Sequence, residues 1–371
     1  MRRPLRCGFT TGACAAAAAR GAALMLRDGC LVEAVELTLP AGITASFALR
    51  GQRFDGEAAA CCVIKDAGDD PDVTNGCEVW AEVGFRKGDS PLQNQGQSPA
   101  VTITGGTGIG RVTKPGLAVA VGESAINPVP RRMITAAVAE VFAPLAPGFS
   151  LHATISIPDG AERARRTLNA RLGILGGLSI LGTTGVVVPV SHRAWTDTID
   201  TALDVALAAG CTQVVASTGR SSELAAQRRL ARPEEAFILM GDHVGHLAGA
   251  AARRGAGELV IAAQFAKLVK IACGHPQTHA ATVSLDLATL AGWARASGLD
   301  AALIERLEWA HTARELYQEL GPHHPLVALV AMRAIERLQE WAPGVRCGVL
   351  LAGYAGEPAV TFGALFGARE P

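Results

Sequence analysis

The sequence predicts two domains, an N-terminal α+β sandwich with a mixed sheet and a C-terminal doubly wound, Rossmann-like three-layer αβα domain. Two observations favour this fold class: short alternating strands dominate the first half, and apolar strands alternate with longer helices in the second. The 371 residues also exceed one ordinary core, because a domain commonly holds about 150 residues. We place the boundary within a glycine-rich connection, which gives domains of residues 1–180 and 181–371.

The first domain is expected to begin with a helix of small residues. Alanine fills most positions from Ala13 to about Arg27, and Thr10 or Thr11 is a suitable N-cap that would leave free amides beside the threonines. Alternating apolar residues then predict strands at residues 33–39, 46–50, 59–65, 78–85, 101–104, 117–121 and 151–157. Helical patterns predict two further helices, at residues 130–142 and 161–168.

The second domain alternates strands and helices regularly. Apolar strands are predicted at residues 212–217, 236–240, 258–262 and 346–351, with a final run at 359–363. Helices are predicted at residues 195–209, 221–230 and 244–254, and helical patterns continue from 281 to about 340 with breaks near 298 and 321–325. Because short glycine-bearing turns join these elements, the pattern indicates parallel βαβ units.

Composition and charge restrict the class of partner. Thirty-four basic residues balance thirty-four acidic ones, so no net field would draw the chain to nucleic acid or to an anionic membrane. No segment has the ~18 consecutive apolar residues that a membrane span requires. Nine cysteines without a C-x-x-C pair argue against a disulfide framework and a zinc knuckle. We therefore expect a cytoplasmic protein that binds a small molecule.

Two glycine-rich stretches could bring backbone amides close to an anionic ligand. The first stretch has the glycines Gly105, Gly106, Gly108 and Gly110 and the cations Arg111 and Lys114. Pro115 stands where the helix of a Rossmann fingerprint would begin, which argues against a dinucleotide loop. The second stretch comprises Gly176, Gly177, Gly182, Thr183 and Thr184. For both stretches, spacing supports tight structural packing as well as it supports a ligand loop.

Titratable residues form weaker patterns. The acidic stretch at residues 65–72 lacks the ligand spacing of a calcium loop, and it is either a solvated turn or a cluster in which crowding raises the proton affinity of one carboxylate. The histidines include pairs at helical spacing but no H-E-x-x-H motif, which argues against a zinc hydrolase. Residues 217–220 follow a buried strand and precede a helix, where an open α/β sheet places its ligands.

Several segments, taken in order, resemble the cobalt-precorrin-5B (carbon 1) methyltransferase family. They begin with Gly8-Phe-Thr-Thr-Gly-Ala-Cys14 and continue through residues 65–76, 108–116, 125–131 and 171–185. Long matches in one order are more specific than any single glycine motif. The chain departs from the family's pattern at residues 263–280, where Lys267, Lys270, Thr278 and His279 are kept but a neighbouring glycine-histidine pair and a serine are absent.

The resemblance implies transfer of a methyl group from S-adenosylmethionine, as co-substrate, to carbon 1 of cobalt-precorrin-5B. The product would be cobalt-precorrin-6A, in the construction of the corrin ring of cobalamin. A sulfonium is already a strong electrophile, so the protein would mainly hold the methyl group in line with the ring carbon at roughly 3 to 3.5 Å. Cobalt would arrive within the substrate, and no protein-bound metal is expected. A homodimer is left open.

The resemblance also implies roles for residues of the matched segments. The glycines and threonines of both glycine-rich stretches are expected to bind S-adenosylmethionine. Donors for the carboxylates of the macrocycle are expected at Thr10, Thr11, Gly12, Arg111, Lys114, Arg131 and Arg132. Asp66 or His279 is expected to remove a proton. We expect these groups to meet in a cleft between the two halves.

Two other classes of function stay open. A non-catalytic corrinoid-binding protein would use the same site without chemistry. A nicotinamide-dependent corrin reductase would explain the doubly wound half, but it requires a glycine fingerprint after the first strand of a βαβ unit and an acidic residue about twenty positions later. Residues 218–221 supply neither feature.

Overall fold

The computed structural model describes residues 3–85, 100–143, 150–310, 312–354 and 359–366, and the chain divides into two compact units, Met1–Ser191 and His192–Pro371. The first unit extends beyond residue 180 because β1 (Gly8–Phe9) pairs antiparallel with β11 (Val186–Val187). The segment after the second glycine-rich stretch therefore belongs to the first unit. Both units combine helices with sheets.

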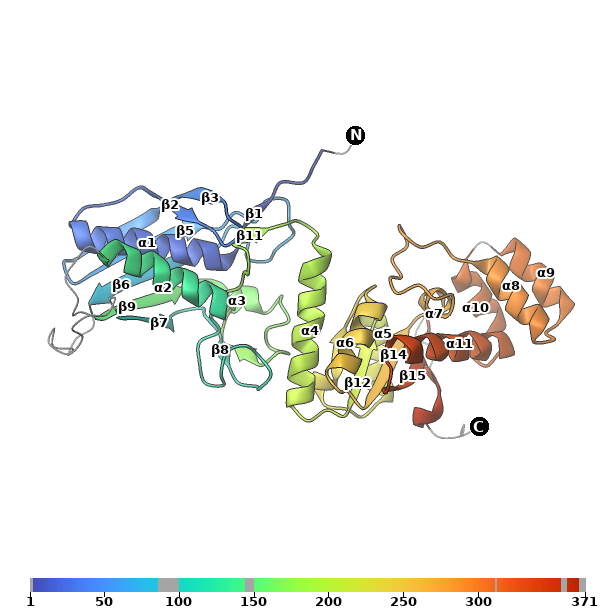
Figure 1. Cartoon of the computed structure of the whole chain (residues 1–371). Coiled ribbons are helices and arrows are strands. Elements are labelled where there is room, and N and C mark those ends of the chain that lie inside the picture. The colour runs from blue at the N-terminus through green and yellow to red at the C-terminus, as the bar shows by residue number, and fades with distance from the viewer. Residues whose placement is uncertain (1–2, 86–99, 144–149, 311, 355–358, 367–371) are drawn as a thin grey trace. The chain divides into compact units, whose positions relative to one another are not determined.

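The first unit is built on a five-stranded sheet with two helices on one face (Figure 1). In spatial order the strands are β4 (Arg50–Phe54), β5 (Ala58–Ile64), β6 (Glu78–Phe85), β9 (Ser150–Ser156) and β7 (Ala100–Gly105). Neighbouring strands are antiparallel except β9 and β7, which confirms the predicted mixed sheet. The helices are α1 (Thr11–Asp28) and α2 (Pro128–Phe142), and a separate hairpin joins β2 (Ala34–Thr38) to β3 (Thr44–Ala48).

Alternation along β6 separates the two faces of this sheet. Val79, Ala81 and Val83 are fully buried in the core that α1 and α2 cover. Successive side chains of a strand point to opposite faces, so Glu78, Trp80 and Glu82 share the other face. Both glutamates are exposed and the tryptophan is half-buried. The sheet thus has one apolar face and one polar face.

Helix α1 packs closely because its side chains are small. The residues from Ala13 to Ala19 have no exposed surface. The Thr10 side chain caps the helix by accepting a hydrogen bond from the Ala13 amide at 3.2 Å, and Gly29 ends it in the left-handed region with φ of 66°. The predicted helix is confirmed, with Thr10 rather than Thr11 as its N-cap.

The second unit is built on a five-stranded sheet of which four strands are parallel. In spatial order these are β13 (Phe237–Leu239), β12 (Gln213–Ser217), β14 (Glu258–Ala263) and β15 (Arg346–Leu351), followed by the antiparallel edge strand β16 (Val360–Phe362). The parallel strands expected from the alternating pattern are therefore present.

Helices lie on both faces of this second sheet. The helices are α4 (His192–Ala208), α5 (Arg220–Arg229), α6 (Val244–Arg253), α7 (Phe265–Ala272), α8 (Leu287–Ala296), α9 (Ala301–Trp309), α10 (Ala313–Leu320) and α11 (Pro325–Trp341). The larger core joins α4, α6, α7 and α11 to one face, and a smaller cluster joins Ala226 of α5 to Val215 and Val260 on the other.

Several local predictions were wrong. Residues 117–121 form no strand, because Leu117 and Val119 pack instead onto a small loop core of Val112, Ala125 and Ile174. The helix predicted at 161–168 is shorter, α3 (Gly160–Ala164). Strand β4 and helix α7 were not predicted.

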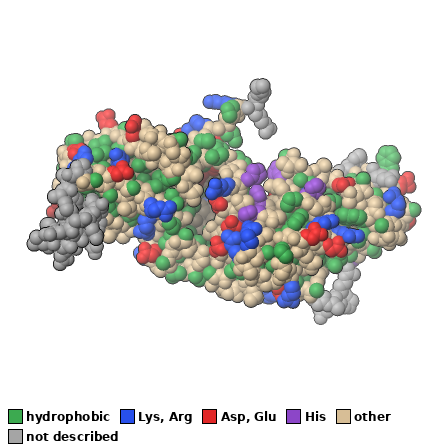
Figure 2. All heavy atoms as spheres, viewed as in Figure 1, with side chains coloured by type: hydrophobic (Ala, Val, Ile, Leu, Met, Phe, Trp, Pro, Cys, Tyr) green, Lys and Arg blue, Asp and Glu red, His purple; other side chains and the backbone are tan. Residues whose placement is uncertain are grey.

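Charged side chains of both signs are interspersed over the visible surface of each unit (Figure 2). This distribution agrees with the equal numbers of acidic and basic residues. All nine cysteines are free thiols. Within the described ranges, no helix is both long enough and apolar enough to cross a membrane.

Candidate functional site

The two glycine-rich stretches lie side by side in the first unit. β8 (Arg111–Val112) pairs antiparallel with β10 (Ile174–Leu175). The Gly110 amide donates to the Leu178 carbonyl at 2.8 Å, and the Leu178 amide donates to the Gly108 carbonyl at 2.9 Å. Segments that are about 70 residues apart in the sequence are therefore neighbours in space, as the ligand-loop hypothesis requires.

Close backbone packing accounts for several of these glycines. A Cβ atom on Gly177 would overlap the Gly108 carbonyl oxygen, and a Cβ atom on Gly108 would overlap the Ile157 carbonyl oxygen. Gly108 also has a φ of 73°, which side chains rarely allow. Gly176 has open space around it but a φ of 83°. Packing and backbone conformation explain these glycines without a ligand, and their role in binding stays a prediction.

The N-cap and the first residues of α1 hold the end of the second glycine-rich stretch. The Thr11 hydroxyl accepts a hydrogen bond from the Leu181 amide at 3.0 Å and donates one to the Leu181 carbonyl at 3.2 Å. The Gly12 amide donates to the same carbonyl at 2.9 Å. Gly182 packs so closely that a Cβ atom would overlap the Thr10 hydroxyl. The amide of Gly12, expected to be free for a ligand, is therefore engaged by the chain itself.

The predicted cations lie along the 111–114 loop and helix α2. Three of them donate to backbone carbonyls: Arg111 to Gly122, Lys114 to Arg171 at 3.3 Å and Arg131 to Ile103 at 3.2 Å. Arg132, Thr183 and Thr184 are exposed. A guanidinium has five N–H donors, so one bond to a carbonyl leaves others for a carboxylate.

The acidic stretch contains a buried ion pair. Lys65 is 2% exposed, and its Nζ lies 2.6 Å from Asp72 Oδ2. The amide and hydroxyl of Thr74 both donate to Asp72 Oδ1 at 2.7 Å. Burial disfavours the charged form of Asp72, but the bonds from Lys65 and Thr74 outweigh burial, and the pKa of Asp72 is lowered. Crowding therefore does not raise the proton affinity of this carboxylate.

Asp66 also has a lowered pKa. Arg6 donates two hydrogen bonds to its carboxylate, at 2.5 and 2.8 Å, and the Gly68 amide donates a third at 2.9 Å. These bonds stabilise the anion and lower the pKa of Asp66 to about 2. The alternative in which crowding raises the proton affinity of a carboxylate is therefore wrong for Asp66 as well, because a cation and an amide bind this carboxylate.

We expect the Asp66 carboxyl group to titrate near pH 2 in the intact protein. In an Arg6→Gln variant the midpoint should rise toward about 3.9, the ordinary value for Asp, because the main donor is lost. A carboxyl-carbon NMR titration measures both midpoints. The Arg27→Gln variant is the control, because Arg27 bonds to Asp28 instead. An Asp66 midpoint that stays near pH 2 in Arg6→Gln would contradict the conclusion that Arg6 lowers the pKa of Asp66.

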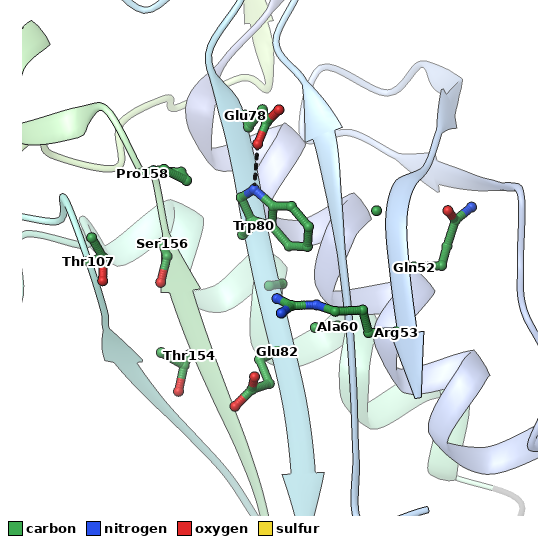
Figure 3. A pocket seen from close by; sticks show the side chains of 12 residues that line it. Gln52, Arg53, Ala60, Glu78, Trp80, Glu82, Thr107, Thr154, Ser156 and Pro158 are labelled. Atoms are coloured by element: carbon green, nitrogen blue, oxygen red, sulfur yellow. Dashed lines mark hydrogen bonds between the residues drawn. The ribbon is translucent and has the colours of Figure 1, made fainter. Parts of the chain in front are cut away.

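A pocket of about 680 Å³ lies on the polar face of the first unit's sheet (Figure 3). Its lining includes Gln52, Arg53, Glu78, Trp80, Glu82, Thr107, Thr154, Ser156 and Pro158. Thr107 comes from the first glycine-rich stretch. The adjacent Gly106 approaches the pocket wall so closely that a Cβ atom would overlap the Ser156 hydroxyl. The first glycine-rich stretch therefore borders this pocket.

Trp80 contacts two charged side chains of the pocket, those of Glu78 and Arg53. Its Nε1 donates to Glu78 Oε2 at 2.8 Å, and the Arg53 guanidinium carbon lies 4.9 Å from the centroid of the indole (Figure 3). Gly51 leaves room for the ring, since a Cβ atom there would overlap it. Within the part of the chain that the structure describes, neither the Arg53 side chain nor the Glu82 side chain has a hydrogen bond or an ion pair. Both charges are available to a ligand.

The sequence prediction missed Arg53, Trp80 and Glu82. A signal was present for two of them, because Glu78, Trp80 and Glu82 alternate with apolar residues in a strand that was correctly predicted. An outward tryptophan between two carboxylates is unusual for a solvated face. Arg53 lies on β4, whose residues offer no apolar alternation, so this strand carried no comparable signal.

In the second unit, the segment that departs from the family's pattern forms a polar cluster. Lys267 and Lys270 each donate to the Thr278 carbonyl at 3.1 Å, and Lys267 forms an ion pair with Asp242. The Thr278 hydroxyl donates to Asp242 Oδ1 at 2.6 Å. Lys270 is 7% exposed, and burial lowers its pKa. His279 follows this cluster, is exposed, and accepts a backbone N–H at Nδ1. Asp242 was not among the predicted residues.

The polar cluster belongs to the carboxyl edge of the parallel sheet. Asp242 follows β13, and Lys267 is in α7, directly after β14. Ser217, which ends β12, is fully buried at this edge, and its hydroxyl has no described partner. Open α/β sheets bind ligands at this edge. In the described ranges, no group of three or more His, Cys, Asp or Glu side chains could hold a metal ion.

Comparison with known proteins gives consistent matches. Residues 1–189 match the family model described as CbiD, and residues 277–361 match the one described as CbiD, C-terminal domain. A relative from Pelobacter propionicus, named cobalt-precorrin-5B C(1)-methyltransferase, is 54% identical over 95% of both chains. Relatives of the same name from Geobacter metallireducens and Geobacillus thermodenitrificans are 52% and 43% identical, over 95% and 86% of this chain and 97% and 84% of theirs.

One solved structure is also similar. It is a crystal structure of a cobalamin biosynthesis protein (cbiD) from Archaeoglobus fulgidus, 26% identical in sequence. The match covers 80% of this chain and 85% of that chain, with a TM-score of 0.38.

Proposed function

The chain belongs to the CbiD family, and from this premise we propose that it transfers a methyl group to carbon 1 of cobalt-precorrin-5B. The product is cobalt-precorrin-6A, on the route to cobalamin. One observation carries the proposal: relatives that are 52 to 54% identical over 95% of this chain have the name of this methyltransferase. The proposed methyl donor is S-adenosylmethionine.

The pocket of the first unit has a volume of about 680 Å³. Ligand pockets usually have about 300–1,000 Å³, so this pocket is large enough to support binding of S-adenosylmethionine. The donor supplies a methyl group that its sulfonium already activates, so the protein needs no nucleophilic triad. The chain's own residues would position the reactants and exclude water. We propose that the glycine-rich stretches, from Gly105 to Gly110 and from Gly176 to Thr184, border the donor.

The macrocycle carries several carboxylates, and cobalt enters as part of it. We propose that the donors predicted from the sequence contact these carboxylates, namely Thr10, Thr11, Arg111, Lys114, Arg131 and Arg132. Gly12 is left out of this set because its amide already donates to the Leu181 carbonyl. Asp66 and His279 are the proposed proton acceptors. A carboxylate with a pKa of about 2 holds a proton weakly, which favours His279.

The proposal extends to the fold and the compartment. Four parallel strands with helices on both faces support a doubly wound, Rossmann-like second unit. Free thiols at all nine cysteines support a reducing, cytoplasmic setting. A homodimer remains a prediction, which sedimentation equilibrium would test.

The direct test is anaerobic incubation of the full-length protein with cobalt-precorrin-5B and methyl-labelled S-adenosylmethionine. We expect label on the macrocycle, detected by mass spectrometry and placed at carbon 1 by NMR. Binding of the macrocycle without transfer of label would favour a corrinoid-binding protein instead. The variants Asp66→Asn and His279→Ala distinguish the two proposed proton acceptors. Methyl transfer should become slower only in the variant that lacks the residue that accepts the proton.

A further inference from the structure

The pocket on the polar face of the first sheet has charges of both signs that the chain leaves unpaired. Arg53 and Glu82 both line it, and neither is joined to the other or to any other described residue by an ion pair. Glu78 adds a second carboxylate. The lining therefore has one guanidinium and two carboxylates. A complementary ligand has one carboxylate and more than one positive charge.

We propose that this pocket binds the methionine end of S-adenosylmethionine, an inference that rests on the proposed function. Arg53 meets the ligand's carboxylate, and Glu82 faces its ammonium and sulfonium groups. The charges of this ligand match those of the lining in sign and number. A macrocycle with many carboxylates would meet two carboxylates here, so charge favours the donor over the methyl acceptor.

The guanidinium is already oriented for a carboxylate. Arg53 lies over the Trp80 indole at 4.9 Å, an attraction that restricts the long side chain before any ligand arrives. Trp80 is in turn held by its 2.8 Å hydrogen bond to Glu78. A guanidinium stacked on a ring keeps its in-plane N–H donors, which match a carboxylate in paired bonds. Less side-chain entropy is then lost on binding.

The wall of the pocket on the β9 side suits the sugar and base of the donor. Thr107, Thr154 and Ser156 border this wall, and Figure 3 shows them on one side of Trp80, with the Arg53 backbone on the other. Each hydroxyl can donate one hydrogen bond and accept others, as ribose and adenine require. Thr107 also connects this wall to the first glycine-rich stretch. The pocket therefore refines the donor site predicted from that stretch.

The experiment uses the full-length protein and two probes, S-adenosylmethionine and S-adenosylhomocysteine, which lacks the sulfonium charge. Trp80 is the one tryptophan of the first unit and the other four lie in the second, so the part of the fluorescence change that depends on Trp80 reports on this pocket. We expect Trp80→Phe to remove most of the fluorescence change while calorimetry still detects binding. Arg53→Gln should weaken both probes about tenfold, which corresponds to about 1.4 kcal/mol. Glu82→Gln should weaken S-adenosylmethionine about fivefold and S-adenosylhomocysteine less.

The matched control is Glu36→Gln, which removes an exposed carboxylate on β2, outside the pocket, and should leave both affinities unchanged. Weaker binding in the pocket variants, with unchanged melting temperatures, supports the inference. Full affinity in all variants overturns the inference, because the donor then binds elsewhere, yet the proposed function stands. A wild-type protein that binds neither probe and transfers no label overturns both.

Discussion

Replacing Gly108 by alanine should destabilise the first unit by about 4 kcal/mol. The new Cβ atom would overlap the Ile157 carbonyl oxygen, which is backbone and cannot rotate away. The φ of 73° adds strain for any residue with a side chain. Gly108 also lies at the junction of both glycine-rich stretches, so a shift there would displace Gly177 and Gly160. Urea unfolding followed by tryptophan fluorescence measures the loss, and comparison with Trp80→Phe identifies the signal of the first unit, because the other four tryptophans lie in the second unit.

Gly122→Ala is the matched control for this experiment. Gly122 lies in the same loop region with a φ of 90°, but no atom lies within 4 Å of the place that its new Cβ atom would take. It should therefore lose only the conformational part, about 1 kcal/mol. Equal losses in the two variants would show that packing around Gly108 adds nothing.

Replacing Asp72 by alanine should cost about 3–5 kcal/mol, because it leaves the Lys65 ammonium buried without its counter-ion. Lys65 is 2% exposed, and Asp72 is its ion-pair partner at 2.6 Å. The double variant Lys65→Met/Asp72→Ala should recover most of the loss, since no buried charge remains. Denaturant unfolding of the two single variants and the double variant gives the coupling free energy. Additive losses would contradict this account.

The same pair predicts how stability depends on pH. The folded pKa of Asp72 is lowered relative to the unfolded chain. Its contribution to the free energy of unfolding is therefore present above the unfolded pKa, about 3.9, and is lost as pH falls through the folded value. Asp72→Ala should accordingly lose this part of the acid dependence.

The sequence predicted elements well where alternation was strong. Strand β6 was predicted at its observed bounds because its buried Val79, Ala81 and Val83 alternate with polar residues. Apolar residues also predicted a strand at residues 117–121, but there they pack into a small loop core instead. Strand β4 has no buried residue, and its position depends on pairing with β5, which local sequence does not encode.

The candidate site was predicted only in part for a similar reason. The family resemblance implied that both glycine-rich stretches bind the same ligand, and the backbone bonds of Leu178 to Gly108 and Gly110 show that the two stretches are adjacent. The pocket depends on register: Arg53 pairs with Ala60, and Ala60 pairs with Glu82. Such alignment across three strands depends on long-range contacts, so no motif signals it.

The placement of the hydrophobic cores has a consequence for synthesis on the ribosome. The buried core of the first unit uses residues 13–180, and the main core of the second uses residues 199–362. Each core is thus encoded in one uninterrupted stretch. Amino-terminal domains usually fold first during translation. The nascent first unit can therefore close around α1 while the second is still being made, which limits the time its strands are open to mispairing.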